Sequence, residues 1–223
     1  TLSYKNNINL GTATVTISGK GRYKGTITTN FKIVMGTIQK AIMSTQTTSS
    51  ITVLWAKYNN VTGYEVYMST SKNGKYTKVA TITKNSIVKY KKTKLSAGKN
   101  YYFKVRAYKT VAGKKNYGAY SAVITTATKT KTPSITKASA GKKKATIKWK
   151  KVSGATGYEI YMSTSKGKGY KKIATNTKNS KVSYTKTKLK SKKKYYFKIR
   201  TYKTVAGKKV YSSYSKVKTV KVK

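Results

Sequence analysis

A repeat with an offset of 94 residues constrains the fold of this chain more than any other feature. Residues 101–108 (YYFKVRAY) recur almost unchanged as residues 195–202 (YYFKIRTY), and 195 − 101 gives the offset of 94. Many other landmarks repeat at the same spacing, among them Trp55 with Trp149 and Leu95 with Leu189. Such a period is too long for a solenoid repeat and fits two copies of a small domain.

Hydrophobic alternation within each copy predicts β-strands. In the first copy Ile51, Val53 and Trp55 fall on one face of a segment, and Tyr101 and Phe103 do the same on a later one. Turn signals separate these short segments, a pattern typical of an all-β sandwich. We expect a short N-terminal β segment at 1–36 and two sandwich repeats at 37–130 and 131–223. The short junctions predict a semi-rigid rod.

A motif in each copy resembles the fibronectin type III family. In the first copy it comprises Leu95, Gly98, Tyr101, Phe103, Val105 and Ala107. In the second copy Leu189, Tyr195, Phe197 and Ile199 fit, but Lys192 stands where the first copy has Gly98. The resemblance covers residues 38–223 and implies two tandem immunoglobulin-like sandwiches, with Tyr101 and Tyr195 as tyrosine corners. It also implies adhesive, spacer or ligand-presenting modules rather than catalysts.

The first 34 residues predict a strand–turn–strand–turn–strand arrangement that is too short to bury a core of its own. Residues 4–26 resemble the C-terminal half of a small β-rich repeat of secreted and surface proteins of Firmicutes. This resemblance implies a secreted or cell-surface protein of a Gram-positive bacterium. The segment is then a truncated domain or one completed by another chain, and Thr1 is expected to mark a cut rather than a native start.

Composition excludes most catalytic and metal chemistry. The chain has 51 Lys and Arg residues against 2 acidic residues, Glu65 and Glu159, and it has no His or Cys. General acid–base catalysis, glycoside hydrolysis and metal binding need His, Cys or grouped carboxylates. A Ser–Lys dyad is formally available, but no spacing points to one. We therefore expect no enzyme activity and no cofactor, and no apolar run is long enough for a transmembrane segment.

The net charge of +49 predicts an anionic partner. Plain solubility is the alternative, but soluble domains ordinarily mix both signs of charge. The favoured function is attachment to anionic polymers such as teichoic acid or sulfated or sialylated glycans. A specific host surface protein, such as an antibody, and a plain spacer role stay open. Nucleic acid is expected to bind only non-specifically, because no recognition motif is present.

An outward-facing surface that mixes tyrosines with cations is the candidate ligand face. Such a surface can hold sugars on tyrosine rings while cations meet anionic groups, although Tyr and Lys are also ordinary outward strand residues. The ten residues are Tyr67, Tyr102, Lys104, Arg106, Tyr108, Tyr161, Tyr196, Lys198, Arg200 and Tyr202. Glu65 is expected opposite Arg106 or Lys104, and Glu159 opposite Arg200 or Lys198, as local cross-strand charge partners.

The loops before the last strand of each repeat are further candidates. Their residues are Gly113, Lys114 and Lys115, and Gly207, Lys208 and Lys209. In the family that the chain resembles, this loop is a common recognition site. A simple glycine hairpin turn is the slightly favoured interpretation.

Overall fold

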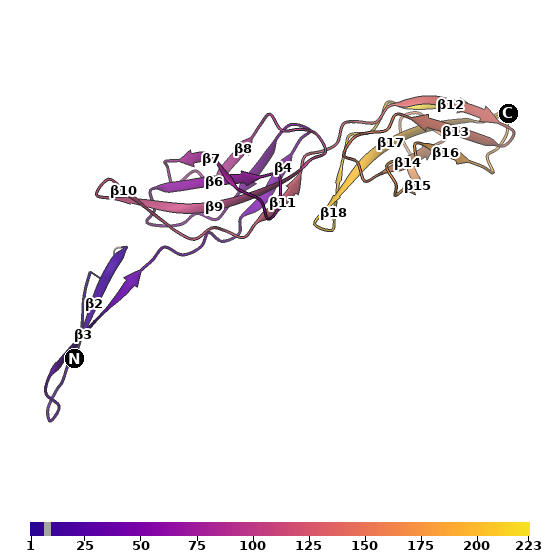
Figure 1. Cartoon of the computed structure of the whole chain (residues 1–223). Helices are drawn as coiled ribbons and strands as arrows, with labels where there is room; N and C mark the ends of the chain where they lie inside the picture. Colours follow the sequence, from indigo (N-terminus) through magenta and orange to yellow (C-terminus); the bar gives the residue numbers. More distant parts are fainter. Residues whose placement is uncertain (7–9) are drawn as a thin grey trace.

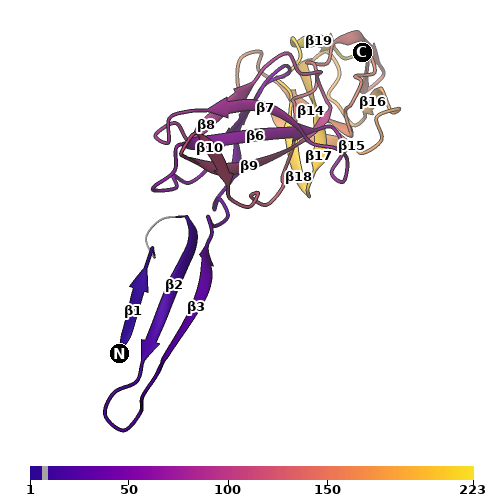
Figure 2. The same cartoon turned by 60° about the vertical axis from the view of Figure 1, so that its left-hand side comes forward.

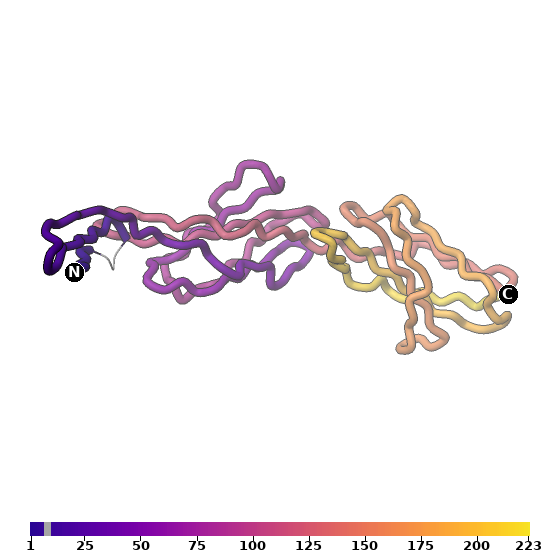
Figure 3. Tube along the Cα trace, turned by 90° about the horizontal axis from the view of Figure 1, so that it is seen from below, coloured from indigo at the N-terminus to yellow at the C-terminus, as the bar shows by residue number. Residues whose placement is uncertain are grey.

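The computed structural model describes residues 1–6 and 10–223, and the described part consists of strands and their connections. An N-terminal sheet and two sandwich repeats follow one another in a row, with the two termini at opposite ends (Figures 1 and 3). This elongated arrangement agrees with the short junctions in the sequence.

The N-terminal segment forms a three-stranded antiparallel sheet in the order β1-β2-β3, and it stands apart from the sandwiches (Figure 2). Its strands are β1 (Leu2–Lys5), β2 (Gly11–Ser18) and β3 (Thr26–Ile33). The cross-strand row Leu2, Ile17 and Ile27 lies on an apolar face, yet these side chains are 62%, 46% and 69% exposed. The prediction that this segment cannot bury a core of its own is confirmed, while residues 7–9 of the surface-repeat resemblance lie outside the described residues.

The first repeat is a sandwich of two sheets. Its strands are β4 (Ile42–Gln46), β5 (Ile51–Leu54), β6 (Gly63–Ser69), β7 (Thr77–Ile82), β8 (Lys89–Lys92), β9 (Asn100–Val111), β10 (Lys114–Tyr117) and β11 (Ile124–Ala127). One sheet has the order β4-β5-β8, and the other has the order β10-β9-β6-β7 with β11 also paired to β9. The alternation in the sequence places Val53, Trp55, Tyr64 and Phe103 in the core between the sheets.

The second repeat has the same topology. Its strands are β12 (Ile135–Gly141), β13 (Lys144–Trp149), β14 (Gly157–Ser163), β15 (Lys171–Asn176), β16 (Ser183–Lys186), β17 (Lys194–Val205), β18 (Lys208–Tyr211) and β19 (Lys218–Lys221). Its sheets have the orders β12-β13-β16 and β15-β14-β17-β18, with β19 paired to β17. Trp149, Tyr158 and Phe197 fill the core positions of their counterparts.

Both expected tyrosine corners are confirmed. The Tyr101 hydroxyl accepts a hydrogen bond from the Ser96 backbone N–H at 2.9 Å, five residues upstream. The Tyr195 hydroxyl accepts the equivalent bond from Lys190 at 3.0 Å. Each bond ties the turn that precedes the long strand β9 or β17 to the core, so the strands that carry the candidate ligand face start from a fixed point.

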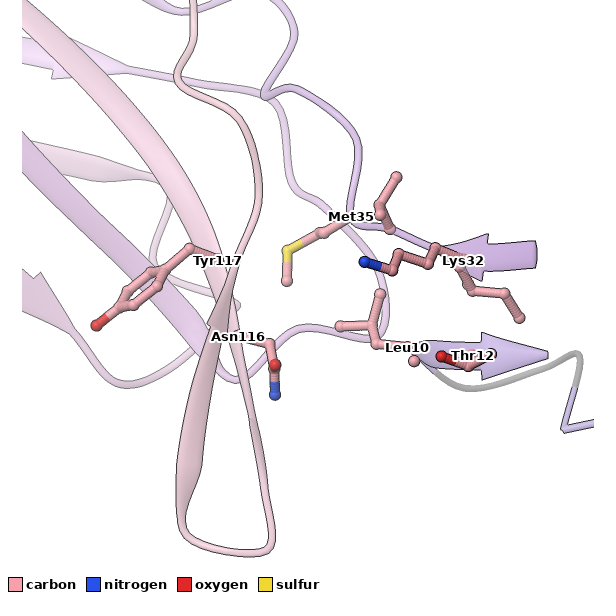
Figure 4. Close-up of a pocket in the computed structure, with 9 residues that line it drawn as sticks. Leu10, Thr12, Lys32, Met35, Asn116 and Tyr117 are labelled. Atoms are coloured by element: carbon pink, nitrogen blue, oxygen red, sulfur yellow. The ribbon is translucent and has the colours of Figure 1, made fainter. Parts of the chain in front are cut away.

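Contacts at the two junctions join the three units. A pocket of about 240 Å³ lies between the N-terminal sheet and β10, and Met35, Leu10, Asn116 and Tyr117 are among its lining residues, with the Tyr117 ring directed away from Met35 and Leu10 (Figure 4). At the other junction, the buried hydroxyl of Thr130 is hydrogen-bonded to the buried hydroxyl of Thr201 on β17. The linker between the repeats is therefore anchored in the second sandwich rather than loose.

Candidate functional site

The candidate ligand face is the outer surface of the larger sheet in each repeat. Strands β6 and β9 are antiparallel neighbours whose register pairs Glu65 with Arg106 and Tyr67 with Lys104. Because side chains alternate across a strand, these four residues lie on the face opposite the core. The expected partnership of Glu65 with Arg106 is confirmed, whereas Lys104 lies opposite Tyr67.

Glu65 is the centre of this face, and its side chain is completely buried. Its carboxylate accepts hydrogen bonds from Arg106 Nη2 at 2.7 Å, the Tyr67 hydroxyl at 2.7 Å and Lys78 Nζ at 2.9 Å. A third cation, Lys115, approaches to 3.9 Å. Burial alone would raise the pKa of the carboxyl, but the hydrogen bonds from Lys78, Arg106 and Tyr67 outweigh it and lower the pKa to about 2.

The second repeat builds the same cluster around Glu159. Its carboxylate is 2.8 Å from Arg200 Nη2, 2.9 Å from the Tyr161 hydroxyl and 3.3 Å from Lys172 Nζ. Burial opposes ionisation here too, yet the hydrogen bonds from Arg200, Tyr161 and Lys172 bring the pKa of this carboxyl to about 2. The sequence predicted local charge partners on the outward face of the sheet, which faces solvent in a simple sandwich. Both carboxylates are instead buried, because long side chains from neighbouring strands cover them.

Aromatic rings enclose the cations of this face. The Arg106 guanidinium lies 3.7 Å from the centre of the Tyr117 ring, and Lys104 Nζ lies 4.2 Å from the centre of the Tyr76 ring. In the second repeat Arg200 lies 3.7 Å from Tyr211, and Lys198 lies 4.2 Å from both Tyr170 and Tyr214. Cation–π contacts of this kind hold each cation in place over a ring.

Two predicted ligand residues are buried, so they are not accessible to a ligand. Tyr108 and Tyr202 were expected to be exposed, but they are only 2% and 3% exposed. The Tyr108 ring packs over Gly63, and a β-carbon added to Gly63 would lie 3.1 Å from the Tyr108 hydroxyl. Lys115 covers the ring, with its Nζ atom 4.5 Å from the ring centre. The missing side chain at Gly63 leaves room for the Ile82 carbonyl oxygen of the neighbouring strand and for the Tyr108 hydroxyl. The prediction that Tyr108 and Tyr202 are exposed is therefore wrong.

The other predicted residues of the face are partly accessible. Tyr67, Tyr102, Lys104 and Arg106 are half-buried, as are Tyr161, Tyr196, Lys198 and Arg200 in the second repeat. The two arginines are committed to Glu65 and Glu159, so the lysines are the cations that remain able to meet a ligand. Whether any of these residues binds a ligand stays a prediction.

The predicted loops are tight hairpin turns. Ala112 and Gly113 connect β9 to β10 with φ values of 48° and 75°, and Ala206 and Gly207 repeat the arrangement with 47° and 74°. Two consecutive positive φ angles are the requirement of a type I′ two-residue turn. Gly113 and Lys114 are exposed at the tip, as are Gly207 and Lys208, whereas Lys115 and Lys209 reach back toward the carboxylates.

Six tyrosines of the face, three in each repeat, were not predicted from the sequence. Tyr76 lies just before β7, Tyr117 ends β10, and Tyr120 follows in an irregular stretch that returns across the sheet. Tyr120 packs edge-on against Tyr67 with ring centres 5.2 Å apart, and Tyr214 and Tyr161 do the same at 5.1 Å. The internal repeat could have revealed them, because Tyr76, Tyr117 and Tyr120 recur 94 residues later as Tyr170, Tyr211 and Tyr214.

A cleft of about 540 Å³ between the two repeats was also missed. The turn Ser96–Tyr101 of the first repeat forms one wall, and Ser153, Gly154 and Lys203 of the second repeat form the other. Lys99 and Lys203 both line it. No strand pattern points to a site between two domains, so only the three-dimensional arrangement finds it.

Within residues 1–6 and 10–223, no three metal-ligating side chains of the His, Cys, Asp or Glu type come together. The same residues contain no helix that is long and apolar enough to cross a membrane.

One family model matches part of the chain. Residues 36–126 match the family described as the fibronectin type III domain. No curated protein matches the chain. Among solved structures, the FN1–FN3 domains of chicken CNTN1 are similar at 16% identity, with 94% of this chain and 77% of that chain covered and a TM-score of 0.42.

A two-domain fibronectin type III segment of chicken tenascin is similar at 17% identity, with 82% of this chain and 96% of that chain covered and a TM-score of 0.45. The predicted fold class, an all-β chain with tandem domains of this type, is confirmed.

Proposed function

We propose that this chain, in which residues 36–126 form a fibronectin type III domain, is a non-catalytic module that attaches its parent protein to anionic polymers outside the cell. One observation carries the proposal. The sequence has two acidic side chains, and both are buried beneath cations of the sheet. The exposed side chains that carry charge are therefore all positive. Solubility alone does not require this arrangement, because mixed charges serve it as well.

The partner chemistry follows from the cations. Nearly all of them are lysines, which act as hydrated point charges without the bidentate geometry of arginine. We infer a partner with many anionic groups and no single required geometry, such as teichoic acid or a sulfated or sialylated glycan. The exposed rings of Tyr117, beside Arg106, and Tyr120, beside Lys104, offer contact to sugar rings on the same face. A secreted or cell-surface location accords with this partner.

Retention on immobilised polymers across a salt series tests the proposal. We expect retention on heparin and on wall teichoic acid, none on neutral dextran, and a steep loss of affinity between about 0.05 and 0.5 M NaCl, where the screening length falls to a few ångströms. Binding to the anionic polymers that is unchanged over this range would contradict the proposal. Salt-resistant binding to one host protein would favour the adhesin alternative.

A matched pair of variants tests the contribution of the candidate face. The double variant Lys104→Gln with Lys198→Gln removes two charges from the face, while Lys84→Gln with Lys178→Gln removes two exposed charges from equivalent turns after β7 and β15. We expect the first pair to weaken heparin binding by roughly tenfold and the second by roughly twofold. Equal losses would mean that attraction is spread over the whole surface.

A plain spacer is the second candidate, and the anchored junction favours it. The buried hydrogen bond between Thr130 and Thr201 joins the linker to the second sandwich, as a module that sets a distance requires. A spacer needs no ligand, so it predicts that neutralising surface lysines leaves the attachment of the parent protein unchanged.

A further inference from the structure

The cleft between the two repeats brings together cations from both domains. Lys99 follows the turn that the Tyr101 corner fixes, and Lys203 lies near the end of β17 in the second repeat. Lys203 is half-buried, and its ammonium donates a hydrogen bond to the backbone carbonyl oxygen of Gly154 at 3.3 Å. Two cations that belong to different domains are thus directed into one concave space.

No acidic side chain of the protein neutralises these two cations. The sequence has only Glu65 and Glu159, and each is committed to an arginine and two lysines on the outer face of its own repeat. Burial, reinforced by the nearby charge of Lys99, lowers the pKa of the Lys203 ammonium. A charged group in this position is stabilised when an opposite charge comes within a few ångströms.

The internal repeat shows that the pair exists only at the junction. At the repeat offset, Lys203 corresponds to Lys109 and Lys99 corresponds to Lys193. Lys109 lines a pocket beside the N-terminal segment, with Leu10 and Met35, whereas the Lys193 carbonyl accepts a hydrogen bond from the backbone of Val222 near the C-terminus. Lys109 and Lys193 are therefore matched positions that carry the same charge as Lys203 and Lys99 but do not face each other.

Backbone packing holds the two walls of the cleft close together. An added β-carbon on Gly98 would lie 3.1 Å from the Gly154 Cα atom, so the two turns touch through their backbones. Backbone and hydroxyl groups of Ser96, Thr70 and Ser153 complete the lining with polar atoms. The space beside this contact is large enough for one tetrahedral oxyanion with its first hydration shell.

We propose that this cleft binds one oxyanion, a sulfate or phosphate group, between Lys99 and Lys203. The inference deepens the function proposed above and rests on it, because the group would be carried by the same anionic polymer. Bound in this way, one group of the polymer contacts both repeats at once and links them across the junction. The polymer is then held by a defined site as well as by diffuse charge.

Titration with inorganic sulfate, followed by amide chemical shifts at constant ionic strength, tests the site in the full chain. We expect saturable shifts at Gly98 and Gly154, and no saturation at the matched turn positions Asn60 and Lys192. The double variant Lys99→Gln with Lys203→Gln is expected to weaken sulfate binding by roughly tenfold or more, as for lost hydrogen bonds to a charged group. The control variant Lys109→Gln with Lys193→Gln, with two charges removed from matched positions, is expected to keep it.

Two outcomes would overturn the inference. One is a shift that grows linearly with sulfate at all four positions, and the other is an equal loss of binding in the test and control variants. Heparin retention of the same variants separates this inference from the proposed function. If retention stays salt-dependent while the sulfate titration fails, the polymer binds by diffuse charge and the cleft is not a site. If sulfate saturates the cleft but neither anionic polymer is retained, the cleft binds small oxyanions and the attachment function is wrong.

Discussion

The backbone of Gly154 lies directly against the backbone of Gly98, and a β-carbon added to Gly154 would lie 2.5 Å from the Gly98 carbonyl oxygen. Both glycines have positive φ angles, 68° for Gly98 and 75° for Gly154. Their counterparts in the other copies, Lys192 and Asn60, have positive φ angles as well, at 59° and 57°. Each of the two turns thus has a positive φ angle in both repeats, but the residue is glycine in the copy of the turn that touches the other repeat.

The first prediction concerns this contact. Replacing Gly154 with alanine is expected to change the angle between the repeats, because the new methyl group cannot fit against the Gly98 backbone. Small-angle scattering and residual dipolar couplings measure that angle. Asn60→Ala is the matched control, since it imposes a similar strain at the same turn without a neighbouring domain. An unchanged angle in the Gly154 variant would show that the junction yields elsewhere.

The second prediction concerns acid stability. The pKa of each glutamate is about 2 in the folded state, below its ordinary value of 4.5, so each contributes stability that is fully present above about pH 4.5. This contribution is lost as the pH falls through the folded pKa. Urea denaturation should therefore show a falling free energy of unfolding from about pH 4.5 to 2.

The variant Glu65→Gln with Glu159→Gln provides the control for this effect. No other acidic side chain is present, so the double variant should show a much flatter pH dependence of its unfolding free energy over the same interval. At neutral pH it should be less stable than the parent, because three cations lose their counterion in each repeat. If the unfolding free energy of the variant fell with pH as steeply as that of the parent, the two glutamates would not be the cause of the acid sensitivity.

The third prediction separates charge from shape at the face. Arg106→Lys keeps the charge but loses both guanidinium hydrogen bonds to Glu65, through Nε at 3.1 Å and Nη2 at 2.7 Å, and the stacking on Tyr117. We expect the first repeat to lose roughly 2 kcal/mol of stability. The second repeat, with Arg200 intact, is an internal reference. Per-domain unfolding followed by NMR checks this, and equal stability of the two proteins would mean that only the charge matters.

The fourth prediction tests the linker. Thr130→Val removes the hydroxyl that is hydrogen-bonded to Thr201 and leaves a buried polar group without its partner, which costs about 1–3 kcal/mol. The loss should appear as a lower unfolding midpoint of the second repeat. Thr132→Val, at an exposed linker position, is expected to be neutral. A similar loss in both variants would point to the linker's β propensity instead of the bond.

Alternation and the internal repeat were enough to predict the strands and the two sandwiches, while the tyrosine corners were implied by the resemblance to the fibronectin type III family. They also placed Glu65 opposite Arg106, because alternation decides which face a side chain occupies. Alternation does not say what covers that face. The burial of Glu65 depends on how far the side chains of Lys78, Arg106 and Lys115 reach across the sheet, and Tyr108 is covered by Lys115 and Tyr117 of the short strand β10. The contact between Gly98 and Gly154 was beyond reach for the same reason, since it joins two turns of different domains.

The burial of both carboxylates also governs how copies of this chain meet one another. An exposed strand such as β10 ordinarily invites pairing with the edge of a neighbouring copy. Here every copy approaches its neighbour with charge of a single sign, and repulsion keeps the edges apart. Many copies attached to one surface would therefore repel one another and stay apart, unless a polyanion neutralised their charge and bridged them.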